Sequence, residues 1–260
     1  MKFMKMTKMT KMMKALRICV PVAGILSVAL LFNSCLDDSG YSLGEYRMEI
    51  ATVESLESSR HYFRLDDGTT LWPAAGYYLG HNMEDGQRTW LNYTILSDAK
   101  DGFDHYIKVN GVDSILTKKI AEDKGEENNA VYGTDPVGVD ENNIWIGNGY
   151  LNMIFSFNYG GTKKHFVNLL SAGDEENAYR VEFRHNAYDD PQGMVVSGIV
   201  CFNLSDLPDT GGETVKLTVV VNTFDGVKTY ELDYNSNREQ GTGTGTESSG
   251  FNLENFERVN

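Results

Sequence analysis

Cysteine is scarce in this sequence, and its placement excludes a fold held together by disulfides. The three cysteines are Cys19, inside an apolar N-terminal run, Cys35, just after that run, and Cys201, far downstream. Loss of the run and modification of Cys35 leave one cysteine, so the mature chain can form no internal disulfide. Cys201 lies in the apolar segment VVSGIVCFNL (residues 195–204), which predicts a buried thiol that packs as a small hydrophobic group.

Positive charge is also in short supply. The whole chain has 23 Lys and Arg against 37 Asp and Glu, a formal charge of −14. Residues 1–34 hold six of the bases and no acid, so the remainder has 17 bases against 37 acids, a formal charge of −20. Nucleic-acid binding depends on Lys and Arg that neutralise phosphates, and this balance therefore excludes nucleic acid as a partner.

Signatures of enzymes are missing as well. The sequence has no His-Glu-x-x-His helix, Walker loop or dinucleotide-binding fingerprint. The histidines are scattered, and no two of them stand at the spacing of metal ligands: His61, His81, His105, His165 and His185. We therefore expect a protein that is not an enzyme and that uses no metal or cofactor. His185, which closes a strand-like run in HNAYDD, is expected to serve a turn or cap.

The N-terminus has the pattern of a secretory signal. Residues 1–17 carry the six bases, and the fifteen residues Ile18–Phe32 are almost unbroken apolar sequence. A basic start followed by an apolar run and small residues is typical of a signal peptide. Fifteen residues are also fewer than the roughly 20 that cross a bilayer comfortably. We predict a signal peptide over residues 1–34.

The end of that signal, LFNSC (residues 31–35), resembles the bacterial lipobox. The resemblance implies cleavage before Cys35, a diacylglycerol on its sulfur and an acylated new amine. Because each buried methylene contributes about 0.8 kcal/mol, three acyl chains would anchor the protein durably, and the alternative is an ordinary signal beside a chance cysteine. Asp37 and Asp38 resemble an acidic signal that sends some lipoproteins to the cell surface. The expected location is the outer membrane, lipid-anchored, and the sequence leaves open whether the protein faces the cell surface or the periplasm.

Downstream of the signal, alternation of apolar and polar residues replaces helical periodicity. In AYRVEFRH, the side chains of Tyr179, Val181 and Phe183 fall on one face, as in a half-buried strand. The same alternation occurs in three further runs, over residues 151–157, 215–221 and 230–234. Pairs that suit tight hairpins separate such runs: Asp67-Gly68, Asp85-Gly86, Asp101-Gly102, Asn110-Gly111 and Asp225-Gly226. Short strands at this spacing predict an all-β protein built from barrels or sandwiches.

A polar segment divides the strand-rich sequence into two parts. EDKGEENN (residues 122–129) has four acids and no apolar residue. Polar Gly/Thr/Ser-rich sequence follows Asn235, and its composition cannot bury enough surface to fold. The predicted organisation is a signal peptide (residues 1–34), a lipidated tether (35–44), a small OB-like barrel (45–120), an antiparallel β-sandwich (131–235) and a low-complexity tail (236–260).

Motifs in both parts resemble one known family. The first part contains HYFRLDDGTTLWPAAG (residues 61–76), in which Asp66 and Asp67 are interpreted as hairpin residues and not as a catalytic pair. The second contains NNIWIGNGYLNMIFSF, YRVEFRHNAYDDP and SGIVCFNLSDL. Together, in this order, they are similar to the NigD-like lipoproteins. The resemblance implies an OB-type barrel followed by a β-sandwich and no established catalytic activity. The family name comes from a bacteriocin gene cluster, which implies, by association, a role beside bacteriocins such as immunity.

Three tryptophans offer a possible ligand platform. Trp72, Trp90 and Trp145 could stack on sugars, or they could pack in the core and between the domains. The leading hypothesis is an outer-membrane lipoprotein that acts as a non-catalytic binding or accessory module. One alternative is a surface glycan-binding lipoprotein. Another is a fimbria-type subunit, which would need a removable N-terminal strand after a basic cleavage site, whereas Tyr41–Ile50 contains only Arg47.

Overall fold

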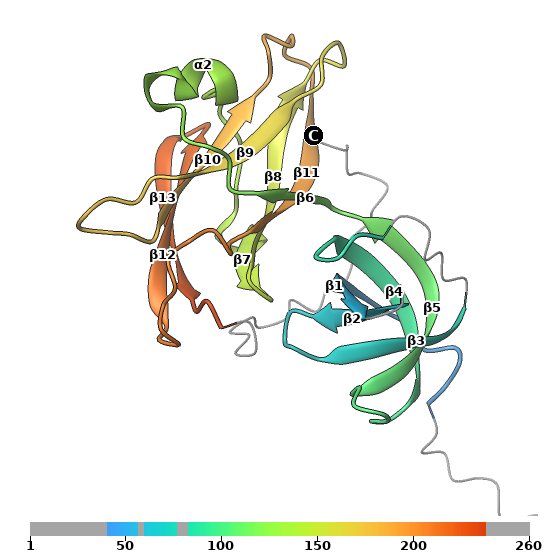
Figure 1. The fold of residues 1–260 in the computed structure, drawn as a ribbon. Helices are drawn as coiled ribbons and strands as arrows, with labels where there is room; N and C mark the ends of the chain where they lie inside the picture. The colour runs from blue at the N-terminus through green and yellow to red at the C-terminus, as the bar shows by residue number, and fades with distance from the viewer. Residues whose placement is uncertain (1–40, 57–59, 77–82, 238–260) are drawn as a thin grey trace, which may run out of the picture. The chain divides into compact units, whose positions relative to one another are not determined.

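The computed structural model describes residues 41–56, 60–76 and 83–237 of the chain. Regular structure among these residues is almost entirely β-strand (Figure 1). The strands form a closed barrel and two four-stranded sheets, all within one compact unit that begins at Ser42. The prediction of an all-β protein, with a small OB-like barrel followed by a β-sandwich, is confirmed.

The barrel is closed in the order β1-β2-β3-β5-β4. Its strands are β1 (Arg47–Leu56), β2 (Arg60–Leu65), β3 (Thr70–Gly76), β4 (Arg88–Ser97) and β5 (His105–Ser114). Neighbours are antiparallel except for the parallel pair β3–β5. Gly76 ends that pair with a φ of +99°, and a Cβ on it would lie 2.0 Å from the carbonyl oxygen of Val109. Alternate side chains point inward and form the core: Ala51, Val53, Phe63, Leu65, Leu71, Leu91, Ile107 and Val109.

The sandwich consists of the sheets β13-β12-β10-β9 and β6-β11-β8-β7. The strands are β6 (Leu116–Lys119), β7 (Ile144–Gly147), β8 (Tyr150–Tyr159), β9 (Phe166–Ser171), β10 (Arg180–Asn186), β11 (Met194–Asn203), β12 (Val215–Thr223) and β13 (Gly226–Tyr234). Most neighbours are antiparallel, as predicted, but β10–β12 and β6–β11 are parallel pairs. The two inner faces share one hydrophobic core, which includes Phe155, Phe183 and Phe202.

Strand β8 is buried on both faces over its first half, and this burial locates the junction between the domains. Leu151 and Met153 point into the sandwich core, as alternation predicts. The opposite face should be polar in an isolated sandwich, yet Tyr150 and Asn152 are fully buried. Tyr150 belongs to a cluster that also contains Trp90 of the barrel, so the barrel covers this face.

In the part of the chain that the structure describes, helical structure is limited to short segments that bury no residue. The polar segment between the two strand-rich parts forms η1 (Gly125–Glu127) and α2 (Asn128–Tyr132), and η2 (Glu141–Asn143) precedes β7. Among the described residues, no helix has the length and apolar character needed to cross a membrane.

Candidate functional site

The structure separates the three tryptophans. Trp90 is 6% exposed and packs with Tyr150 and Cys201 at the junction, where half-buried Trp145 contacts the same cluster. Trp72 lies elsewhere, half-buried on the outside of β3. Trp90 and Trp145 therefore pack at the junction between the domains, whereas Trp72 lies on the outside of the barrel. Cys35 lies outside the described residues.

The junction holds a buried polar network centred on Arg88, whose side chain is not exposed at all. Its guanidinium donates to Asp66 Oδ1 at 2.6 Å and to Thr52 Oγ1 at 2.8 Å, both in the barrel. It also donates to Asn152 Oδ1 of β8 at 3.1 Å, and Trp145 Nε1 donates to Asp66 Oδ2 at 3.1 Å. One charged pair thus binds both domains.

The electrostatics of this network favour a structural role. Burial lowers the pKa of Arg88, but the charge and hydrogen bond of Asp66, together with the neighbouring Cys201, outweigh it, and the pKa is raised. Burial raises the pKa of the adjacent Cys201 thiol to about 11, so it stays protonated and unreactive at neutral pH. Cys201 is fully buried and free, which confirms the prediction of a core thiol.

The Asp66-Asp67 pair divides into two different roles. Asp67 serves the hairpin, because its Oδ1 accepts a hydrogen bond from the backbone N–H of Thr69 at 2.8 Å. Asp66 also lies in the turn, as interpreted from the sequence, but its side chain is 8% exposed and paired with Arg88, a contact that the sequence did not indicate. Gly147 leaves room for it: a Cβ there would lie 2.2 Å from Asp66 Cγ.

A half-exposed aromatic cluster covers adjacent strands on the outside of the barrel. We call it the Trp72 cluster, and it consists of Tyr62, Trp72, Phe103 and Tyr106. The Phe103 ring centroid lies 5.0 Å from that of Trp72 and 5.3 Å from that of Tyr62. All four side chains are half-buried and come from β2, β3, β5 and the turn before β5.

Charged groups surround the Trp72 cluster. The Arg60 guanidinium lies 5.6 Å from the Trp72 ring, and Lys100 Nζ lies 5.1 Å from the Tyr106 ring. Asp101 accepts a hydrogen bond from the Tyr106 hydroxyl at 2.7 Å. Rings, cations and a carboxylate on one face of an OB barrel can bind a ligand by stacking and hydrogen bonding. The rings come together through the pairing of β3 with β2 and β5.

A second polar cluster lies inside the sandwich. His165 Nδ1 is 2.9 Å from His185 Nε2, and His165 Nε2 is 3.3 Å from Asp190 Oδ2. Burial, followed by the neighbouring His165, lowers the pKa of His185 to about 4, so His185 is neutral at neutral pH. His185 was expected in a turn or cap role, and that expectation is wrong because its ring is buried in the core. The described residues contain no group of three or more His, Cys, Asp or Glu that could hold a metal ion.

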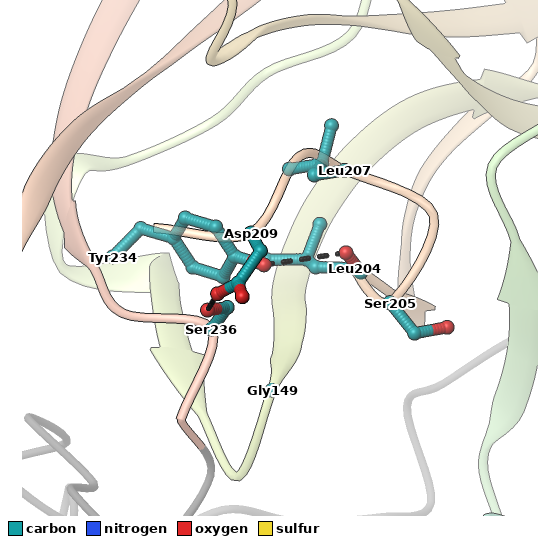
Figure 2. A pocket seen from close by; sticks show the side chains of 7 residues that line it. All are labelled: Gly149, Leu204, Ser205, Leu207, Asp209, Tyr234 and Ser236. Atoms are coloured by element: carbon teal, nitrogen blue, oxygen red, sulfur yellow. Dashed lines mark hydrogen bonds between the residues drawn. The ribbon is translucent and has the colours of Figure 1, made fainter. Parts of the chain in front are cut away.

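A pocket of about 330 Å³ opens at one end of the sandwich (Figure 2). Leu204, Leu207 and Tyr234 line it with buried side chains, and Asp209 and Ser236 add polar groups. Figure 2 shows that these polar groups bond inside the wall: Ser236 Oγ donates to Asp209 Oδ1 at 2.6 Å, and the Tyr234 hydroxyl donates to the Leu204 carbonyl at 3.3 Å. Asp209, Tyr234 and Ser236 are therefore already hydrogen-bonded within the wall of the pocket.

The segment GYSLG (residues 40–44) has the Gly-x-Ser-x-Gly spacing of a nucleophile elbow. An elbow needs a strand before the serine and a helix after it. Residues 41–44 instead form a turn ahead of β1, in which Ser42 Oγ accepts a hydrogen bond from the backbone N–H of Gly44 at 3.2 Å. The spacing here does not form that catalytic motif.

Comparison with protein families assigns both domains. Residues 50–115 match the NigD-like N-terminal OB domain, and residues 119–234 match the NigD-like C-terminal beta sandwich domain. The chain belongs to the NigD-like family. A comparison with curated proteins finds no match.

Solved structures share this NigD-like architecture. A Parabacteroides distasonis protein, provisionally described as toxin related, is 49% identical, with a TM-score of 0.69 over 75% of this chain and 96% of that one. A Bacteroides vulgatus protein of unknown function is 27% identical, with a TM-score of 0.66 over 82% and 100% of the two chains. A Bacteroides caccae NigD-like immunity protein, 21% identical with a TM-score of 0.50 over 73% and 93%, shows the fold alone.

Proposed function

We propose that this NigD-like protein is a lipoprotein of the outer membrane, anchored through acylated Cys35, and that it acts as a non-catalytic binding or accessory module. The observation that carries the proposal is the N-terminal pattern: six bases, fifteen apolar residues and then LFNSC (residues 31–35). Membership of the NigD-like family, whose name comes from a bacteriocin gene cluster, supports an accessory role beside a bacteriocin by association.

The arrangement of the buried polar groups supports a role without catalysis. Arg88 and Asp66 are paired with each other and tie the two domains together. His165 and Asp190 likewise contact each other, with side chains 1% and 0% exposed. Groups that catalyse a reaction must reach the substrate, and these reach only their own neighbours.

Replacement of Cys35 tests the anchor. Wild-type protein and Cys35→Ala are expressed at full length. For each, we compare the share found in the membrane fraction, which detergent extracts, with the share found in the aqueous phase. Cys201→Ala is the matched control, because it removes the other thiol of the mature chain. We expect wild type and Cys201→Ala in the membrane fraction and Cys35→Ala in the aqueous phase. Continued membrane partition of Cys35→Ala would refute the anchor.

The Trp72 cluster favours a second candidate function, the binding of a glycan at the cell surface. Two of its rings, Tyr62 and Trp72, lie on the second and third strands of an OB barrel, the face by which such barrels bind oligosaccharides. We expect a soluble fragment of residues 36–260 to be retained by at least one polysaccharide of a panel, and Trp72→Ala to weaken that binding at least tenfold. Tyr46→Ala, which changes an exposed aromatic outside the cluster, is the control. Absence of binding across the panel would eliminate this candidate.

A further inference from the structure

Exposed large hydrophobic side chains gather in two places. Of the ten that the described residues contain, three precede β1. Six more come from strand ends and loops of the sandwich: Phe166, Tyr188, Met194, Val195, Phe224 and Val227. The last is Val131 of α2. We call the end of the sandwich that carries these seven side chains the distal surface.

Strand register places these residues at the same end. Phe166 pairs with Asn186, the last residue of β10. Val221 of β12 pairs with Phe183 of β10, so Phe224, three residues further on, lies level with Asn186 at the end of the neighbouring strand. Val131 is held there too, because its carbonyl accepts a hydrogen bond from Asn186 Nδ2 at 3.4 Å. In Figure 1, α2 and the loops that join β8 to β9 and β10 to β11 lie together at this end.

The distal surface faces away from the junction along β8. Met194 pairs with Tyr159, the last residue of β8. Tyr150, the first residue of β8, donates its hydroxyl hydrogen to the Gly86 carbonyl of the barrel at 2.9 Å. Ten residues of strand separate the two ends, about 30 Å at 3.3 Å per residue. The contacts that join the domains therefore leave the distal surface uncovered.

One turn of the distal surface has an unfavourable backbone. Tyr188 and Asp189 have φ angles of +51° and +57°, in a turn closed by a 2.9 Å hydrogen bond from Asp190 N–H to the Ala187 carbonyl. Glycine or asparagine adopts this region readily, whereas a bulky side chain does not. The Tyr188 ring is 44% exposed and contacts Phe166 edge-on, with centroids 5.5 Å apart. Because the ring adds little to the core, a role outside the domain accounts best for its presence.

Several hydrogen bonds to one carboxylate hold this turn against the β8–β9 loop. The Asp190 carboxylate accepts from the backbone N–H groups of Gly160, Thr162 and Lys163 at 2.6, 3.0 and 3.0 Å. The carboxylate also accepts from the Thr162 hydroxyl and contacts His165, which is itself bonded to His185 in the core. A surface that is already ordered loses less conformational entropy when it binds a partner. The hydrogen-bonded turn therefore favours high affinity.

The net negative charge of the chain favours some classes of partner for the distal surface over others. A second copy would bring another formal charge of −14 to the contact, and an anionic lipid surface would repel the chain in the same way. Lys163 and Lys228 are engaged, Lys163 Nζ with the Tyr188 carbonyl and Lys228 Nζ with Asp225 at 3.1 Å. Lys164 and Asp189 are both exposed and carry opposite charges, so the local charge is mixed and the net negative charge of the whole chain favours a partner of net positive charge.

We propose that the distal surface is the docking site for a protein partner of net positive charge, with Tyr188 as its central apolar contact. The proposal rests on the proposed binding function and names the class of partner, but it does not depend on acylation of Cys35. Exposed apolar residues gathered at one end of a domain, with an aromatic side chain among them, are typical of protein–protein contacts.

Site-specific photo-crosslinking tests the proposal. Benzoylphenylalanine replaces Tyr188 or Phe224 in the full-length protein, and Tyr46 in the control, in the cells that naturally make it. We expect the probes at Tyr188 and Phe224 to yield the same partner, a protein of net positive charge linked through an apolar segment, and the control to yield none of it. The yield should fall at least threefold when salt is added to cell envelopes, because steering by net charge is screened.

A second variant separates docking from folding. Tyr188→Asn suits the left-handed backbone, so we expect its unfolding midpoint to equal or exceed that of wild type and its crosslink from Phe224 to fall at least tenfold. The same crosslink should persist in the Cys35→Ala background, which separates failure of docking from failure of the anchor. No crosslink, a crosslink only to a second copy or to lipid, an acidic partner, or an unchanged yield in Tyr188→Asn would each overturn the proposal.

Discussion

Replacement of Arg88 by Met should weaken the whole protein by removing the charge that joins its two domains. The side chain is completely buried and donates to three acceptors, Asp66, Thr52 and Asn152, at 2.6 to 3.1 Å. Met fills a similar volume but leaves the Asp66 carboxylate buried, with Trp145 Nε1 as its other donor. Breaking a buried pair from one side typically costs about 3–5 kcal/mol, because the remaining charge is left uncompensated.

Two matched variants show whether the loss comes from that stranded charge. In Arg88→Met/Asp66→Asn no charge remains, and the substituted amide can still accept from Trp145, so we expect most of the lost stability to return. In Arg64→Met the broken pair, with Glu54, is partly exposed, with side chains 26% and 22% accessible. We expect that control to lose no more than about 1 kcal/mol.

Urea unfolding followed by tryptophan fluorescence measures these free energies. Trp90 and Trp145 lie at the junction, so their emission reports its opening directly. We expect Arg88→Met to unfold at a lower urea concentration, with the tryptophan signal changing before the far-ultraviolet circular dichroism. A loss below about 1 kcal/mol, or a double variant no more stable than the single one, would show that Asp66 is hydrated and that this reasoning is wrong.

Three other predictions concern stability. The pKa of His185 is about 4 in the fold against 6.5 ordinarily, so between these values the unfolded chain binds more protons and stability falls as pH falls. We expect a loss of about 2 kcal/mol from pH 7.5 to pH 5 in urea unfolding, much reduced in His185→Asn; an equal loss in both would contradict the assignment. Gly147→Ala should lower the free energy of unfolding by about 1–3 kcal/mol, because the new Cβ would lie 2.2 Å from Asp66 Cγ. The control Gly111→Ala should be nearly neutral, since its Cβ would lie 4.0 Å from the nearest atom. Similar melting temperatures for the two variants would be inconsistent with this packing. Tyr188→Asn should stabilise the fold by about 1 kcal/mol through relief of the +51° φ, and Tyr46→Asn should not; a lower melting temperature for Tyr188→Asn would show that the ring contributes to packing.

The strands and their inward faces were predictable because alternation is a local property of the sequence. Val181 and Phe183 point into the sandwich core, as do Leu151 and Met153, and each was assigned from its own run of residues. The hairpin at Asp67 was predictable for the same reason, since its side chain bonds a backbone group two residues away.

The partners of buried polar residues were not predictable in this way. Arg88 meets Asp66 across 22 positions of sequence, and His165 meets His185 across 20, because strand pairing sets the register of each contact. Alternation placed Trp90 on an outward face but could not say whether water or another domain covers that face. The structure shows that it packs with Tyr150 of β8.

The sequence by itself determined the class of the protein: the signal-like N-terminus, the all-β pattern, the acidic charge and the NigD-like motifs all depend on residues near one another in the chain. Only the tertiary structure decided which side chains meet. The Trp72 cluster, the network around Arg88 and the distal surface each bring together residues from separate strands. Such contacts depend on pairing and packing between distant segments, and no local pattern encodes them.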